Sequence, residues 1–169
     1  ATNFNGADTL DVEVTDGHAT ENASVAITVI PVNDAPQGAN STIATLEDTA
    51  RTLPAIDFGF SDPNDGPANT LQAVKITTLP GAGTLTDNNV AVTAGQFVSL
   101  ADINAGLLKF TPAANANGNG YASFTFQVQD NGGSANGGVD LDPTPNTITI
   151  HVTPVNDAPT VADAIADQN

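Results

Sequence analysis

The side chains of this chain that could do chemistry are mainly carboxylates. The sequence holds sixteen Asp and three Glu against two Lys and one Arg, which gives a formal net charge of −16. Such a charge disfavours nucleic acid and anionic membrane surfaces as partners and favours cations. Asp in turns also offers a short, stiff carboxylate to hard ions such as calcium. The alternative is a solvated acidic surface that keeps a long polymer soluble.

No residue pattern typical of an enzyme accompanies these carboxylates. The two histidines, His18 and His151, stand without a nucleophile elbow, a phosphate-binding loop or zinc-ligand spacing. Cysteine is absent, which excludes disulfides and thiolate metal sites. No apolar run approaches the length of a membrane span, so we expect no membrane insertion. The sequence therefore predicts a protein that is not an enzyme.

One hexapeptide occurs twice and indicates a tandem array. Pro31-Val32-Asn33-Asp34-Ala35-Pro36 returns letter for letter at residues 154–159, at a spacing of 123 residues. The strands upstream of each copy match at an offset of 114 instead, so nine extra residues lie between Gly132 and Pro143. We predict that residues 1–34 are the C-terminal strands of an upstream repeat, 35–157 a complete repeat, and 158–169 the start of the next.

Alternating apolar residues predict an all-β fold of two packed sheets, with turn signals between the strands. The predicted strands contain Leu10/Val12/Val14, Val25/Ile27/Val29, Val74/Ile76, Leu108/Phe110, Phe124/Phe126/Val128 and Ile148/Ile150/Val152. One short helical turn is expected from Ser99 to Ala105, with Ser99 as its cap. The segment Leu53–Phe60 is interrupted by Pro and Gly, which favours an edge or bulged strand.

Strands 8–15 and 23–30 cannot bury a core by themselves, because an isolated two-stranded hairpin is marginal in water. Their apolar face needs a partner. We considered packing on the complete repeat, pairing with a neighbouring molecule, and head-to-tail assembly by strand complementation.

Three motifs resemble the cadherin-like repeats of large bacterial surface adhesins, which are often type I-secreted RTX proteins of biofilms. They are Val32-Asn33-Asp34-Ala35-Pro36, Glu47-Asp48 and Asp62-Pro63-Asn64-Asp65-Gly66, and the run from Gly83 to Pro112 shows the same likeness. The resemblance implies a Greek-key β-sandwich of cadherin or immunoglobulin type, extracellular, on a bacterial cell surface or secreted. It implies a structural extender repeat that supports cell adhesion or biofilm formation, with adjacent repeats of the same chain as partners. The alternative is a carbohydrate-binding or homophilic adhesion module, whose partners would be glycans or like repeats on neighbouring molecules.

The same resemblance implies calcium at each junction between repeats. The ligands it implies are Asn33 and Asp34 from the linker, Glu47 from the start of the domain, Asp62 and Asp65 from the Asp-rich turn, and Asn156 and Asp157 at the second junction. Calcium takes six to eight oxygen ligands, which no single turn here supplies but one domain end could gather. The alternatives are an Asx turn at Asn33–Pro36 and a simple β-turn at Asp62–Gly66. For Asp16, Asp130 and the segment Asn115–Asn119, turn formation is favoured over metal binding.

Overall fold

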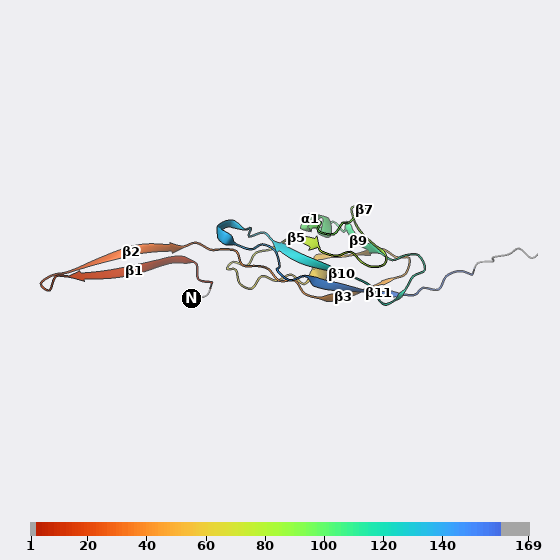
Figure 1. The fold of residues 1–169 in the computed structure, drawn as a ribbon, viewed down its shortest axis with the longest axis horizontal. Helices are drawn as coiled ribbons and strands as arrows, with labels where there is room; N and C mark the ends of the chain where they lie inside the picture. The colour runs from red at the N-terminus through yellow and green to blue at the C-terminus, as the bar shows by residue number, and fades with distance from the viewer. Residues whose placement is uncertain (1–2, 160–169) are drawn as a thin grey trace, which may run out of the picture.

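The computed structural model describes residues 3–159 and contains two packed β-sheets with a separate hairpin (Figure 1). The elements are β1 (Gly6–Thr15), β2 (Thr20–Val29), β3 (Ser41–Leu46), β4 (Arg51–Thr52), η1 (Ala55–Phe58), β5 (Leu71–Ile76), β6 (Thr84–Asp87), β7 (Val90–Ala91), β8 (Phe97–Ser99), α1 (Leu100–Asn104), β9 (Leu108–Thr111), β10 (Gly118–Asp130), η2 (Ala135–Gly137) and β11 (Asn146–Thr153). The predicted all-β, immunoglobulin-like sandwich is confirmed. Within residues 3–159, no helix combines the length and hydropathy that crossing a bilayer requires.

The larger sheet has the strand order β3-β11-β10-β5-β8, and the smaller has the order β4-β9-β6-β7. β3 pairs with β11 in parallel, whereas every other pair between these strands is antiparallel. β10 is the longest strand and lies between β11 and β5. It therefore runs through the sandwich from one end to the other, so its two ends mark the two ends of the sandwich.

The core consists of the alternating apolar residues that predicted the strands. Phe124, Phe126 and Val128 of β10 are at most 1 % exposed, and Ile148 and Ile150 of β11 are fully buried. The ring of Phe126 meets that of Phe58 edge to face at a centroid distance of 5.0 Å. Period-two alternation gives each strand one apolar face, and the two sheets bury those faces against each other.

The predicted helical turn is confirmed as α1. Ser99 is its N-cap: the side-chain hydroxyl accepts a hydrogen bond from the Asp102 amide at 3.1 Å and donates one to the Asp102 carboxylate at 2.6 Å. Gly106 follows the helix with a φ of 71°, in the left-handed region that glycine adopts without strain.

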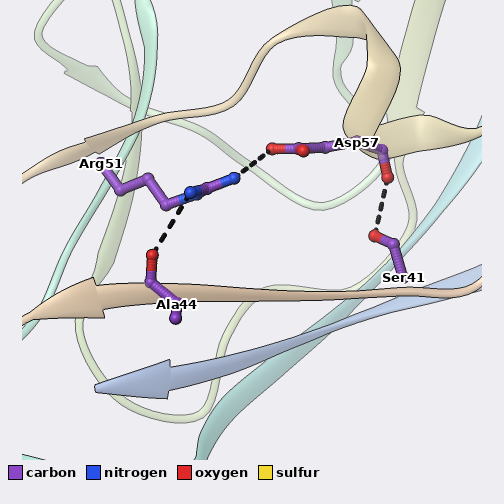
Figure 2. Close-up of polar contacts among 4 residues, drawn as sticks. All are labelled: Ser41, Ala44, Arg51 and Asp57. Atoms are coloured by element: carbon purple, nitrogen blue, oxygen red, sulfur yellow. Dashed lines mark hydrogen bonds and ion pairs between the residues drawn. The ribbon is translucent and has the colours of Figure 1, made fainter. Parts of the chain in front are cut away.

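The prediction of an edge or bulged strand at Leu53–Phe60 is wrong. Strand pairing stops at Thr52, and the short 3₁₀ helix η1 follows because Pro54 begins a turn and Gly59 ends it with a φ of 58°. Arg51 fixes this segment against β3 (Figure 2): its guanidinium lies 2.9 Å from the Asp57 carboxylate and donates to the carbonyl of Ala44. Ser41 of β3 donates to the Asp57 carbonyl at 2.7 Å.

The hairpin β1–β2 extends from the sandwich along the long axis of the molecule (Figure 1). One face carries the apolar side chains, and all of them are exposed, from 36 % for Val29 to 63 % for Val14. Its register repeats that of β10–β11: Leu10 pairs with Val25 as Phe124 pairs with Ile148. The hairpin is thus the structural counterpart of two central strands whose other neighbours, β3 and β5, have no equivalent beside it.

Candidate metal centre

Three carboxylates converge at the end of the sandwich that faces the hairpin. Oxygen atoms of Asp62, Asp65 and Asp130 all lie within 4.8 Å of one another. Asp130 ends β10 and is fully buried, and Asp62 follows an isolated bridge between Gln37 and Ser61 and is 7 % exposed. Like charges this close disfavour their own ionisation unless a positive charge joins them.

In the part of the chain that the structure describes, no basic side chain forms an ion pair with this cluster. Within residues 3–159 the sole ion pair is that of Arg51 with Asp57. The Asp62 carboxylate accepts a hydrogen bond from the Asn69 amide at 2.8 Å through Oδ2, but its Oδ1 is buried with no hydrogen-bond partner. Buried polar atoms are nearly always paired, so a bare carboxylate oxygen beside two further carboxylates is the position expected of a cation ligand.

Asp130, the most deeply buried member of the cluster, has a pKa above its ordinary value. Burial is the main cause of its raised pKa, and the charges of Asp62 and Asp140 raise the pKa further. Hydrogen bonds from the Gly132 amide and the Asn33 side chain oppose the rise. A bound cation would have the same effect as these donors, only stronger, because it would favour the ionised form of every carboxylate around it.

The linker between β2 and β3, residues 30–40, contacts the cluster. The Asn33 side-chain amide donates to Asp130 Oδ1 at 3.0 Å, and its carbonyl oxygen accepts a hydrogen bond from Asn69. The amide of Asp34 donates to Asp65 Oδ2 at 3.1 Å. The structure therefore gathers four of the predicted residues, Asn33, Asp34, Asp62 and Asp65, at one end of the repeat.

Asp130 belongs to this cluster although the sequence favoured only a turn there. It does accept a turn hydrogen bond from the Gly132 amide at 2.9 Å, as its counterpart Asp16 accepts bonds from the amides of His18 and Ala19. In addition, however, the Asp130 carboxylate faces Asp62 and Asp65. The end of β10 lies beside the linker only in the folded sheet, so no local sequence signal marks this role.

The prediction that Glu47 joins Asn33 and Asp34 is wrong. Glu47 is 4 % exposed and lies beside the second linker, where its Oε1 accepts a hydrogen bond from the Val155 amide at 2.6 Å. Its Oε2 accepts from the Asn117 side chain, also at 2.6 Å. Because β3 runs parallel to β11, the end of β3 follows the chain toward the second junction and away from the first.

Asn156 and Asp157 lie exposed just beyond Glu47, and the Asn156 side chain donates to the Asp157 carbonyl at 3.2 Å. The predicted start of the next repeat, 158–169, lies outside the described residues except for Ala158 and Pro159. The two linkers thus lie at opposite ends of the sandwich, the first beside Asp62, Asp65 and Asp130 and the second beside Glu47.

Asn3, which precedes β1, lies beside the first linker. Asn3 is the counterpart of Asn117 at the offset of 114 residues, and it lines a shallow pocket together with Asp34, Asn64 and Asp65. Asn117 binds Glu47 beside the second linker. The turn predicted at Asn115–Asn119 is found at Ala114–Asn115, where Asn115 has a φ of 55°, and Asn117 just after it contacts the predicted metal ligand Glu47.

The chain is similar to a known protein family. The family model described as a bacterial Ig domain matches residues 33–142, from the linker through β10 and into the loop after it. Neither the curated proteins nor the solved structures give a significant match.

Proposed function

Because this chain belongs to the bacterial Ig domain family, we propose that it is a structural extender repeat of a bacterial cell-surface adhesin, stiffened by calcium at its junctions. Bacterial Ig-like domains are typically non-enzymatic modules and are usually extracellular. In this proposal the repeat itself does not bind the target of the adhesin. It holds a separate binding domain at a distance from the cell surface and so supports adhesion or biofilm formation.

The proposed repeat boundaries are 1–34, 35–157 and 158–169. Their main support is the shared register of the hairpin and β10–β11, since Val12 pairs with Ala23 as Phe126 pairs with Asn146. Two strand pairs of equal register, each followed by the same hexapeptide, are what two successive copies of one sandwich would leave in the chain.

The two half-junctions combine into one complete oxygen cage. The preceding repeat contributes a Glu and an Asn, whose equivalents in this repeat are Glu47 and Asn117. The linker contributes an Asn-Asp pair. The following repeat contributes three Asp, which in this repeat are Asp62, Asp65 and Asp130. Carboxylates and amide carbonyls are the ligands that calcium prefers, and their number suits its coordination.

Charge repulsion among these groups supplies the mechanism. With no cation, the carboxylates from the two repeats repel each other and the linker bends. Calcium, when bound, supplies the positive charge that both halves share. For free calcium at about a hundred times its dissociation constant, mass action adds roughly 2.7 kcal/mol to the straight state.

The alternative, a carbohydrate-binding or homophilic module, has weaker support. Platforms for sugars display aromatic rings, but Phe58, Phe110, Phe124 and Phe126 are buried in the core. Phe97 is 46 % exposed, and the Lys75 ammonium lies over its ring, 5.6 Å from the centroid. Among the described residues no cluster of exposed aromatic rings is evident.

The observation that carries the proposal is the unpaired, buried Oδ1 of Asp62. Calorimetric titration of the chain with calcium tests it. Asp62→Asn should weaken calcium binding at least about tenfold, because it removes one full charge from the cage. The matched control Asp11→Asn, an exposed hairpin position, should bind as the parent does. Equal affinity of Asp62→Asn and the parent would contradict the proposal.

A further inference from the structure

The complete repeat and the hairpin differ most in the connection between their paired strands. β1 and β2 are joined by the short turn Asp16–Ala19, and Thr15 pairs directly with Thr20. β10 and β11 are joined by residues 131–145, which we call the insertion loop. The loop holds the nine residues by which the two copies differ. Figure 1 shows it at the end of the sandwich that faces the hairpin.

The insertion loop contacts the linker at two points, one on each side of Pro36. The Val139 amide donates to the Asn33 carbonyl at 2.9 Å, and the Asn33 side chain donates to the Val139 carbonyl at 2.8 Å. Beyond the proline, the Gly38 amide donates to the Asp142 carboxylate at 2.8 Å. The linker is therefore held at both ends of its rigid Ala-Pro step.

The insertion loop is itself hydrogen-bonded to β10, so its contacts with the linker are tied to the larger sheet. The Asp130 amide donates to the Asp140 carbonyl and the Asp142 amide to the Val128 carbonyl, both at 2.9 Å. The Asp142 carboxylate also accepts hydrogen bonds from Thr144 and Asn146, and Asp142 is 4 % exposed. A linker bound to this loop moves with the sandwich.

The fit around Asn33 is close. A Cβ added to Gly132 would lie 1.7 Å from the Asn33 side-chain oxygen, and one added to Gly138 would lie 3.0 Å from the Asn33 Cβ. Glycine at these two positions leaves the space that the Asn33 side chain fills. None of the hydrogen bonds between loop and linker needs an ion.

We infer that the insertion loop is a clasp that holds residues 33–38 on the following sandwich with or without calcium. Bending at this junction is then confined to residues 30–32, of which Ile30 is 65 % and Val32 45 % exposed. The inference rests on the proposed function, in which this segment joins two successive repeats. It gives the cation and the insertion loop different roles. The cation joins the preceding repeat to a linker that the clasp has already positioned, and a repeat with the short turn lacks that clasp.

Backbone ¹⁵N relaxation of the chain in excess chelator tests the clasp. Order parameters at Asn33, Asp34 and Ala35 should match those of β10, about 0.85, while Ile30 and Val32 fall well below. Asn33→Ala should lower the values at Asp34 and Ala35 and speed hydrogen exchange of the Val139 amide severalfold. Gly132→Ala, which keeps the asparagine at position 33 but puts a methyl group where its side chain lies, should do the same. The control Asn156→Ala removes the equivalent Asn of the second linker and should change none of these signals.

Low order parameters from Asn33 to Ala35 in the parent, or unchanged values in both variants, would overturn the inference. Calcium addition separates it from the proposed function. If the linker is rigid in chelator but calcium shifts no resonance near Asp62, the clasp stands and the calcium proposal fails. If the linker becomes rigid only with calcium, the clasp fails and the calcium proposal stands.

Discussion

The side-chain amide of Asn33 lies 3.0 and 3.2 Å from the two carboxylate oxygens of Asp130, a residue 97 positions later in the chain. This pair joins the linker to the end of the central strand β10. It also brings the insertion loop and the acidic cluster to one place, because both lie next to Asp130. This end of the sandwich thus combines hydrogen bonds between linker and loop with a cluster of carboxylates that no basic side chain among residues 3–159 pairs with.

Gly132→Ala should destabilise the repeat by about 1–3 kcal/mol, since the new methyl group would overlap the Asn33 side chain and force it away. Chemical denaturation in calcium-free buffer measures the effect. Gly81→Ala is the matched control, because no atom lies within 4 Å of a Cβ at that position. Equal stability of the two variants would mean that Asn33 relaxes at no cost.

Glu47→Ala should weaken the attachment of the second linker, which begins after β11 at Pro154, to the sandwich. The Val155 amide and the Asn117 side chain would both lose their acceptor, so hydrogen exchange at Val155 should accelerate markedly. Mass spectrometry or NMR can follow this exchange without any metal present. Exchange at Val139 beside the first linker should not change, because Glu47 lies at the other end of the repeat. An unchanged rate at Val155 would show that its bond to Glu47 is not formed in solution.

Asp87 predicts a pH effect on stability. Burial is the main cause of its raised pKa, the charge of Asp102 adds to it, and its Oδ1 is buried without a partner. The folded protein therefore binds this proton more tightly than the unfolded chain, and stability falls as pH rises above the ordinary value of 3.8.

Asp87→Asn removes that loss, so its melting temperature should exceed the parent's by a few degrees at pH 7 and by less as pH approaches 4. The comparison is made by thermal melts across this range in chelator. Asp11→Asn, exposed on the hairpin, controls for the change in net charge. A difference in melting temperature that is constant with pH would contradict the assignment.

The hairpin should be much less stable than the strands it matches. Its apolar residues are exposed, whereas those of β10 and β11 are buried, and an isolated hairpin is marginal in water. Amides of β1 and β2 should therefore exchange at least about a hundredfold faster than their counterparts in β10 and β11. Comparable protection would show that another molecule covers the hairpin, which sedimentation at several concentrations would then reveal.

The strands and the capped helix followed from the sequence because each depends on local pattern. Alternation marks Phe124, Phe126 and Val128 as one buried face, and Ser99 three residues before Asp102 marks a helix start. The segment Leu53–Phe60 was wrongly predicted as a strand because its apolar residues show no regular period. Its 3₁₀ helix depends on Pro54 and Gly59 at the two ends.

The site was harder to predict because its partners meet only through sheet topology. Asn33, Asp34, Asp62 and Asp65 were identified by motif and lie together. Glu47 was assigned to the wrong end, because the direction of β3 follows from its parallel pairing with β11, and such pairing leaves no local signal. Asp130 was passed over for the same reason, since only the fold places the end of β10 beside the linker.

Small-angle scattering of an array of several consecutive repeats, with calcium and then with excess chelator, tests the central claim most directly. Calcium-clamped junctions predict a long, rod-like particle whose maximum dimension shrinks on chelation and recovers when calcium is restored. An array with Asp62→Asn in every repeat should show the shorter dimension under both conditions. Identical dimensions of the parent array with and without calcium would contradict the account.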